Sequence, residues 1–486
     1  MKIIKRYLTI MFLLMVVAGC EEFLERTHPG DLTYDKFYKT EDNFQASVTA
    51  CYRSLKTQIE NLITFTDLMT DNVWCDYYVT GDYVNFKSAN IPTNSSGIKN
   101  FWGACYYSIS YANIIITRIE KSEVPESARE VFVKEAKFIR AFSYFNLVRI
   151  YGGVPKYEQE IVNLSDIYSV GRSSVDEIYD FIISDLKDVL DIDSKRSAKQ
   201  AQEAKGKVTS AAAKALLGKV YLQRGDYQNA VTTLADIVNN SGLELEGQLE
   251  DLYDADGYSD EILFAINYER VGGENSPFTS RTLPRFSRGI LPNVTTSDNG
   301  GGDWVLEPYT VAKFSSQDKR KALIDSMDIV FGSVGEVTFY YSKKYLDIKT
   351  TADFYSGSDF IVLRYADVLL MYADALNQTG STANAYPYIN EVRERAGLGP
   401  LPSNYTKAQM HDALANERQK EFILEGDRWF DLSYRGFSYL KSTLNAFYPH
   451  GARIPNASIE DHEVLFPIPS DEVNLKPDYL TQNTGY

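Results

Sequence analysis

The sequence predicts an all-α-dominated protein in which tetratricopeptide-like helix pairs form a scaffold, with long loop-rich inserts and a few short strands. Two observations carry this prediction. Apolar residues recur at helical spacing through many long segments. Two stretches, near 71–99 and 241–359, replace that spacing with Gly, Ser, Asn, Asp and aromatic residues. Hydrophobic residues make up 44% and charged residues 24% of the 486 positions, which is typical of a folded globular protein.

The helical segments account for most of the chain. The segment Ser127–Tyr151 is apolar almost all round, so we expect it to be buried on most sides. It should end at Gly152-Gly153, because Pro155 prevents the helix from continuing. The segments with clear helical periodicity are Glu41–Gln58, Phe101–Ile119, Ser127–Tyr151, Ser174–Leu190, Ser210–Gln223, Tyr227–Asn239, Phe360–Asn377, Ala383–Arg395 and Lys407–Glu425.

Two stretches match tetratricopeptide units, which are helix-turn-helix repeats of about 34 residues. Turns are expected at Gly225-Asp226 in the first unit and at Thr379-Gly380 in the second. Small residues at the repeat positions let the two helices of a unit approach closely. The matching positions are Leu217, Gly218, Tyr221, Ala230 and Leu234 in the first unit, and Ala373, Leu376, Ala385 and Ile389 in the second.

The two inserts differ in character from the helical scaffold. Short strand-like pieces occur at Ile262–Tyr268 and Val337–Lys343. Long loops are usually functional or disordered, and the high aromatic content of these inserts argues against disorder. Asp254-Ala255-Asp256-Gly257 resembles part of a calcium loop but lacks a third acidic position and the later glutamate. We therefore predict no calcium site at this segment.

The N-terminus has the layout of a secretory signal peptide. Lys2, Lys5 and Arg6 precede the apolar run Tyr7–Ala18, which is shorter than the roughly 20 residues that span a bilayer. The residues VAGC ending at Cys20 resemble a lipobox, in which the cysteine is acylated and becomes the first mature residue. We therefore expect a signal peptide over 1–19 and a single lipid-tethered domain over 20–486.

Composition and residue spacing exclude several classes of protein. The net charge of −16 is poorly suited to nucleic acid or to an anionic membrane surface. Beyond Cys20 the odd number of cysteines implies no disulfide framework. No cysteine or histidine pair has metal-ligand spacing, so we expect no metal and no cofactor.

Four sequence motifs stand in order along the chain. The first is EAKFIRAFSYFNLVRIYGGVP at 135–155. The others are RYADVLLMYADALN at 364–377 with NEVRERAG at 390–397, the run from Glu417-Arg418 to EGDRWFDL at 425–432, and the ending from FPIP at 466–469 to QNTGY at 482–486. Together they resemble the motifs of the SusD/RagB family, and the first closely resembles its signature helix. Two small departures are Ser433-Tyr434 in place of a basic pair and Thr484 where proline is common.

The resemblance implies a non-catalytic lipoprotein of the outer membrane that faces the cell exterior. Such proteins bind a glycan at the surface and deliver it to a SusC-like TonB-dependent transporter. Glu21-Glu22 resembles the acidic export signal of such lipoproteins. The matching motifs are mostly scaffold, so we expect their charged residues to pair with one another within or beside buried helices. These residues are Arg364, Glu421, Glu425, Arg428 and Asp431.

The binding residues should therefore lie in the loops. An aromatic ring offers a flat face to the C–H groups of a sugar, and carboxylate or guanidinium groups can bond its hydroxyls. The regions 71–86 and 276–307 have this composition, whereas Trp102 and Trp429 are predicted to be core. The candidate ligand-binding residues are Trp74 and Trp304 as the leading aromatic platforms, Tyr78, Tyr83 and Phe286 as further rings, and Asp71 and Arg281 as hydrogen-bonding groups.

Two alternatives stay open at this point. The first is a binder of peptides or glycopeptides, as the RagB branch implies; aromatic platforms favour sugar, whereas long backbone-pairing edges favour peptide. The second is a surface glycosidase, which needs two carboxylates about 5–5.5 Å or 6.5–9.5 Å apart in one cleft. No nucleophile elbow, phosphate loop or metal motif is present.

Overall fold

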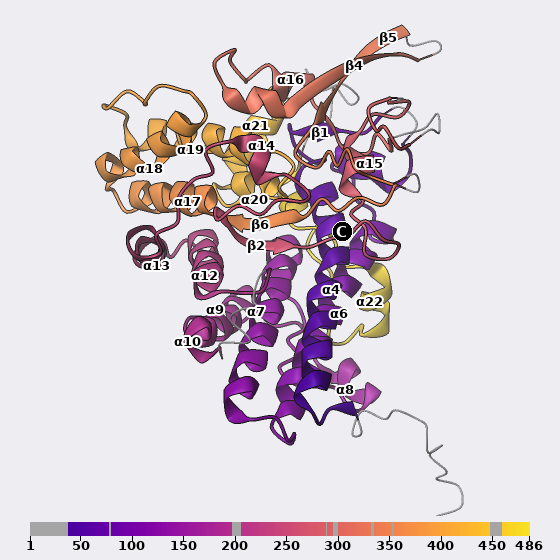
Figure 1. Ribbon diagram of the computed structural model, residues 1–486. Coiled ribbons are helices and arrows are strands. Elements are labelled where there is room, and N and C mark those ends of the chain that lie inside the picture. Colours follow the sequence, from indigo (N-terminus) through magenta and orange to yellow (C-terminus); the bar gives the residue numbers. More distant parts are fainter. Residues whose placement is uncertain are drawn as a thin grey trace, which may run out of the picture.

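The computed structural model describes residues 37–76, 79–196, 206–287, 289–294, 300–331, 335–351, 354–447 and 459–486. Figure 1 shows long helices in the lower half of the molecule, helix pairs at the upper left, and strands with short helices at the upper right. Within the described ranges, no helix combines the length and apolar character that crossing a membrane requires. The helical scaffold with a few short strands confirms the predicted fold class.

A bundle of long helices forms the centre of the core. It consists of α4 (Glu41–Thr66), α6 (Ser96–Ile119), α7 (Glu126–Tyr151) and α9 (Val175–Val189). Helix α6 packs against both α4 and α7, and α7 also packs against α9. Every residue in the C-terminal part of α7 is buried, as predicted from its all-round apolar sequence.

The two tetratricopeptide-like pairs are also present. They are α12 (Ser210–Arg224) with α13 (Tyr227–Asn240), and α17 (Tyr365–Gln378) with α18 (Thr382–Arg395). A Cβ atom on Gly218 of α12 would lie 2.4 Å from Leu234 Cδ2 of α13, so only glycine permits this approach. The turn at Gly225 has φ +83°, the left-handed region that favours glycine.

Shorter helices complete the helical part. They are α5 (Asp82–Lys87), α8 (Leu164–Ser169), α10 (Ile192–Lys195), α14 (Leu249–Leu252), α15 (Phe278–Thr282), α16 (Pro308–Val311), η1 (Lys319–Leu323), α19 (Lys407–Glu421), α20 (Arg428–Ser433), α21 (Phe437–Phe447), η3 (Asp461–Val464) and α22 (Ser470–Leu475).

The strands form two small antiparallel sheets. One has the order β1-β3-β5-β4 and the other pairs β2 with β6. The contact between β1 and β3 joins the two inserts, which lie far apart in the sequence. The strands are β1 (Val73–Trp74), β2 (Ile262–Ile266), β3 (Val305–Leu306), β4 (Ile324–Phe331), β5 (Gly335–Ser342) and β6 (Phe360–Arg364).

Two of the predicted helices have different bounds in the structure. The first five residues of Phe360–Asn377 form strand β6, because this run of large apolar residues pairs with β2 and the helix begins only at Tyr365. The predicted helix Lys407–Glu425 ends at Glu421. Its extension is prevented by a turn in which Leu424 has φ +63° and donates its backbone N–H to Asp67 Oδ1.

The charged residues of the scaffold motifs form a buried ionic network centred on Arg364. Its guanidinium contacts Glu261 at 2.9 Å, Glu421 at 2.7 Å and Glu425 at 2.9 Å, and each of these side chains is at most 5% exposed. Lys344 Nζ adds a contact of 2.6 Å to Glu425. Asp431 pairs with Arg418, and Arg428 with Asp71. The predicted pairing is confirmed for Arg364 with Glu421 and Glu425. Asp431 and Arg428 are also paired, but with Arg418 and Asp71 and not with the other residues of the predicted set.

Replacing Arg364 with methionine removes the cation that the three glutamates share. We expect the free energy of unfolding to fall by about 3–5 kcal/mol, because the change leaves buried carboxylates uncompensated. Chemical denaturation at neutral pH measures this loss. As a control, Lys349→Met removes an exposed pair with Asp256 and should change stability little. Equal effects from both substitutions would contradict the role given to the network.

The loss of stability caused by Arg364→Met should also depend on pH. Burial alone would raise the pKa values of Glu421 and Glu425, but the neighbouring cations lower both. A carboxylate with a lowered folded-state pKa stabilises the protein above its unfolded pKa of about 4.3, and this stability is lost as pH falls through the folded-state pKa. Denaturation at pH 7 and pH 3 should therefore show a smaller difference between variant and wild type at pH 3. A constant difference would contradict the expectation.

Candidate functional site

The two tryptophans proposed as sugar platforms lie inside the protein. Trp74 is 1% exposed; its ring stacks on Phe339 with centroids 5.1 Å apart, and its Nε1 donates to the Leu306 carbonyl. Trp304 is 0% exposed, and its ring lies beside Phe278 with centroids 6.0 Å apart. The pairing of β1 with β3 holds Trp74 in a small apolar cluster, whereas Trp304 belongs to the main core. Neither face is open to a ligand in this structure, which corrects the prediction for these two residues.

Asp71 has a structural role as well. Its carboxylate is fully buried and accepts from Arg428 Nε and Nη2 at 2.9 and 3.1 Å, and from Lys313 Nζ at 2.9 Å. Burial would raise the pKa of Asp71, but the two cations hold it well below its usual range. The carboxylate therefore anchors the start of the first insert and is not available to a ligand. The candidate Tyr78 lies outside the described residues.

Two other candidates, Tyr83 and Arg281, come together at the surface although they lie far apart in the sequence. Arg281 Nη1 donates to the Tyr83 hydroxyl at 2.9 Å, and that hydroxyl donates to Asp303 Oδ2 at 3.4 Å. Arg281 also lies 3.9 Å from the carboxylates of Asp303 and Glu60. We call these four residues, all partly exposed, the Tyr83–Arg281 cluster. They come from α4, α5, α15 and the loop before β3.

The electrostatics of the cluster leave hydrogen-bonding capacity unused. Burial raises the pKa values of Glu60 and Asp303, with Arg281 opposing the shift in each case. Burial likewise raises the pKa of Tyr83 to about 12. The Arg281 guanidinium is thus shared by two carboxylates. The remaining lone pairs of these carboxylates can accept further hydrogen bonds. The cluster can therefore bind a ligand that carries both donors and acceptors.

Phe286 is the exposed ring among the candidates. It is 39% exposed, and its φ of +66° lies in the left-handed region that a bulky residue rarely adopts. Its neighbour Arg285 lies 3.3 Å from Asp76, whose backbone N–H donates to the Gly302 carbonyl next to Asp303. These bonds tie the Phe286 loop to the cluster. Strained backbone of this kind is concentrated at functional sites.

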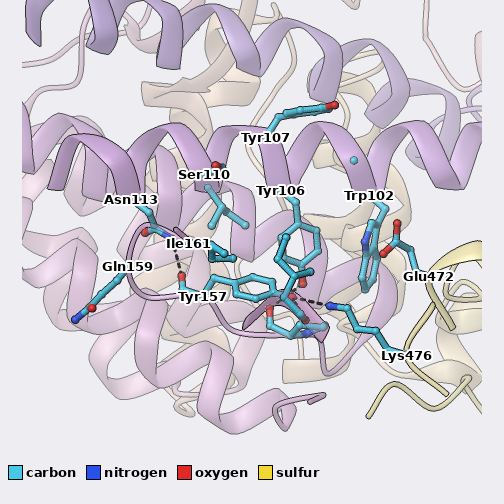
Figure 2. A pocket seen from close by; sticks show the side chains of 14 residues that line it. Trp102, Tyr106, Tyr107, Ser110, Asn113, Tyr157, Gln159, Ile161, Glu472 and Lys476 are labelled. Carbon is cyan, nitrogen blue, oxygen red and sulfur yellow. Dashed lines mark hydrogen bonds between the residues drawn. The ribbon is translucent and has the colours of Figure 1, made fainter. Parts of the chain in front are cut away.

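A concave surface lies on α6 and was not predicted from the sequence. It is a pocket of about 390 Å³ formed by α6, the segment 155–167 and α22. Figure 2 shows that the side chains of Trp102, Tyr106, Tyr157 and Lys476 meet in the space on one side of α6. Trp102 itself is almost fully buried, as predicted, and only part of it reaches the pocket wall.

The sequence carries one signal for this pocket. Tyr106 and Tyr107 follow Trp102 by four and five positions. The aromatic side chains of α6 therefore cover a wider part of the helix surface than the side that faces the core. The partners Tyr157 and Lys476 come from distant segments. Their meeting with α6 depends on how α22 docks, which helical periodicity does not encode.

Comparisons with known proteins match nearly the whole chain. A family model described as "SusD family" matches residues 284–486, and one described as "Starch-binding associating with outer membrane" matches residues 22–222. SusD-like protein P2 of Formosa agariphila is 27% identical, over 99% of this chain and 100% of its own length. A SusD-like protein of Bacteroides ovatus is 26% identical, over 91% of this chain and 84% of its own length.

Solved structures of known proteins share the fold of this chain. A SusD homolog from Bacteroides thetaiotaomicron aligns with a TM-score of 0.80 at 21% identity, covering 93% of this chain and 98% of its own. A laminarin-binding SusD-like protein aligns with a TM-score of 0.77 at 23% identity, covering 92% and 100%. The motifs, the architecture and the matches to both parts of the sequence lead to one conclusion: this chain belongs to the SusD/RagB family.

Proposed function

We propose that this protein is a non-catalytic lipoprotein that captures an oligosaccharide or polysaccharide at the cell surface. It would deliver the glycan to a SusC-like TonB-dependent transporter in the outer membrane. The observation that carries the proposal is the joining of the two loop inserts at one surface: Arg281 of the second insert donates to Tyr83 of the first, and the loop with the exposed Phe286 ring is tied through Arg285 and Asp76 to the residue before Asp303. Family membership supports it, and fold relatives include a laminarin-binding protein and one solved with laminarihexaose.

The chemistry of this surface suits a sugar. A sugar ring presents C–H faces that pack on an aromatic ring, and Phe286 provides one. Its hydroxyl groups both donate and accept, which matches the guanidinium of Arg281 and the carboxylates of Asp303 and Glu60. A few polar groups beside an apolar face are the usual composition of a ligand site.

The arrangement supports binding without catalysis. Glu60 and Asp303 have raised pKa values, as a general acid would. However, both carboxylates face the guanidinium of Arg281 at 3.9 Å. Arg281 therefore occupies the space between them, where a glycosidase would hold the scissile bond.

The Tyr83–Arg281 cluster lies far along α4 from the end at which the described chain begins. Cys20 is outside the described residues, and the described chain enters α4 from the lower end in Figure 1. Glu60 lies nineteen residues after Glu41 on this helix, which is about 28 Å along the axis at 1.5 Å per residue. The cluster therefore lies well away from the start of α4.

Replacing Phe286 with glycine tests the site directly. We expect the affinity for the bound glycan to fall about tenfold, which corresponds to about 1.4 kcal/mol of lost ring contact. Glycine accepts φ +66° without strain, so the fold should not suffer. The mature chain from residue 21 onward would be screened on a glycan array and measured by isothermal titration. The matched control Tyr258→Ala removes a similarly exposed ring elsewhere and should leave affinity unchanged.

The same preparation distinguishes the alternative functions. No binding to any glycan, together with binding to peptides, would replace this proposal with a peptide-binding role of the RagB type. Release of reducing sugar from a bound glycan would overturn the non-catalytic assignment. Equal loss of affinity in Phe286→Gly and Tyr258→Ala would show that the Phe286 surface is not the binding site.

A further inference from the structure

We propose that the pocket on α6 is a second saccharide-binding site, separate from the Tyr83–Arg281 cluster, that takes a neutral sugar unit. The inference rests on the proposed glycan-binding function and adds a location and a ligand class that the cluster does not supply. The two sites share no residue: the pocket is built on α6 and α22, and the cluster on α4, α5 and α15. Figure 1 shows α22 and α15 at different levels of the molecule.

Aromatic rings form the walls of the pocket. The rings of Trp102 and Tyr106 have centroids 5.0 Å apart, and those of Tyr106 and Tyr157 lie 5.7 Å apart, nearly perpendicular. The Tyr106 hydroxyl donates to the Pro155 carbonyl at 2.8 Å, which holds this ring in place. The pocket volume of about 390 Å³ lies within the range of small-molecule sites. The partly exposed rings of Tyr106 and Tyr157 offer preformed apolar faces to the C–H groups of a sugar, and the buried Trp102 backs them.

Polar groups of opposite charge share the pocket with these rings. Lys476 Nζ donates to the Tyr157 hydroxyl at 2.6 Å. Glu472 lies four positions before Lys476 and also lines the pocket, where burial raises the pKa of its carboxyl group. Gln159 adds an amide. Hydrogen-bond donors and acceptors thus surround the apolar ring faces. The positive charge of Lys476 is balanced by the negative charge of Glu472.

This composition selects against other ligands. An anionic ligand would approach the Glu472 carboxylate, which disfavours a second negative charge. A wholly apolar ligand would bury Glu472 and Lys476 without offering them hydrogen bonds, which is costly. A neutral sugar satisfies both requirements because its hydroxyl groups bond the polar ends and its C–H faces pack on the rings.

Gly103 keeps the wall of the pocket open. It lies within α6, where glycine is less favourable than alanine. A Cβ atom built on Gly103 would meet no other atom within 4 Å, so no close packing requires glycine at this position. Gly103 instead lines the pocket. The neighbouring Tyr107, also a lining residue, is 68% exposed.

The substitution Gly103→Gln tests the inference because it fills the pocket without disturbing the core. The new side chain enters open space, and glutamine has a higher helix propensity than the glycine it replaces. Isothermal titration would use the mature chain and neutral oligosaccharides of glucose, mannose, galactose and xylose, including laminarihexaose. We expect two sites per wild-type chain, one of which Gly103→Gln weakens at least tenfold, whereas Phe286→Gly weakens the other. Tyr107→Ala should weaken the same site as Gly103→Gln.

Matched controls separate a binding role from a general effect on the helix. Tyr111→Ala removes an exposed ring from the same helix, outside the pocket lining, and Gly247→Gln adds a side chain in open space elsewhere. Both control variants should bind the oligosaccharides with the affinity of the wild-type protein. A single site that is lost in Phe286→Gly and unchanged in Gly103→Gln and Tyr107→Ala would overturn this inference and leave the proposed function standing. Absence of binding to every neutral oligosaccharide would overturn the second site, whereas binding to no glycan of any kind would overturn the proposed function as well.

Discussion

The buried guanidinium of Arg364 is the interaction on which the rest of this fold depends. It lies at the junction of β6 and α17, and it joins Glu261, next to β2, to Glu421, the last residue of α19, and to Glu425 in the turn that follows. Burying these charges is costly unless every partner is in place. The network is therefore satisfied only when the strand pair, the second tetratricopeptide-like pair and α19 adopt one mutual arrangement. Lys344, which follows β5 and contacts Glu425 at 2.6 Å, extends the same constraint to the second insert.

A second set of buried carboxylates fixes the first insert to this scaffold. Asp67, at the end of α4, accepts the backbone N–H groups of Leu424 and Gly426. Asp71, four residues later, accepts from Arg428 and from Lys313. The scaffold motifs that carry the family resemblance thus also position the loops. Because the insert is held at its start, the later residue Tyr83 reaches the surface in a defined place.

The sequence predicts what depends on local pattern and misses what depends on distant pairing. Helical periodicity placed α7 and the two helix pairs, and the rule that buried charges are paired predicted Glu421 and Glu425, but not Glu261, as partners of Arg364. Periodicity alone could not separate the strand β6 from the helix that follows it. The loop composition around Trp74 suggested exposure, but the β1–β3 pairing buries its ring. That pairing joins residues more than two hundred positions apart, which no local pattern reveals.

The two proposed sugar surfaces stand on one connected helical frame. Helix α4 supplies Glu60 to the cluster, and α6 supplies Tyr106 to the pocket. Between them, the buried amide of Gln58 on α4 donates to Ser108 of α6 at 2.7 Å and to Ser143 of α7 at 2.9 Å. These bonds fix the spacing of the two surfaces. A glycan long enough to occupy both would bind the second as an intramolecular step, so its avidity would exceed either single affinity without any new contact. Fixed spacing would also discriminate by chain length and curvature, because only a glycan that spans the gap in its preferred conformation gains this advantage.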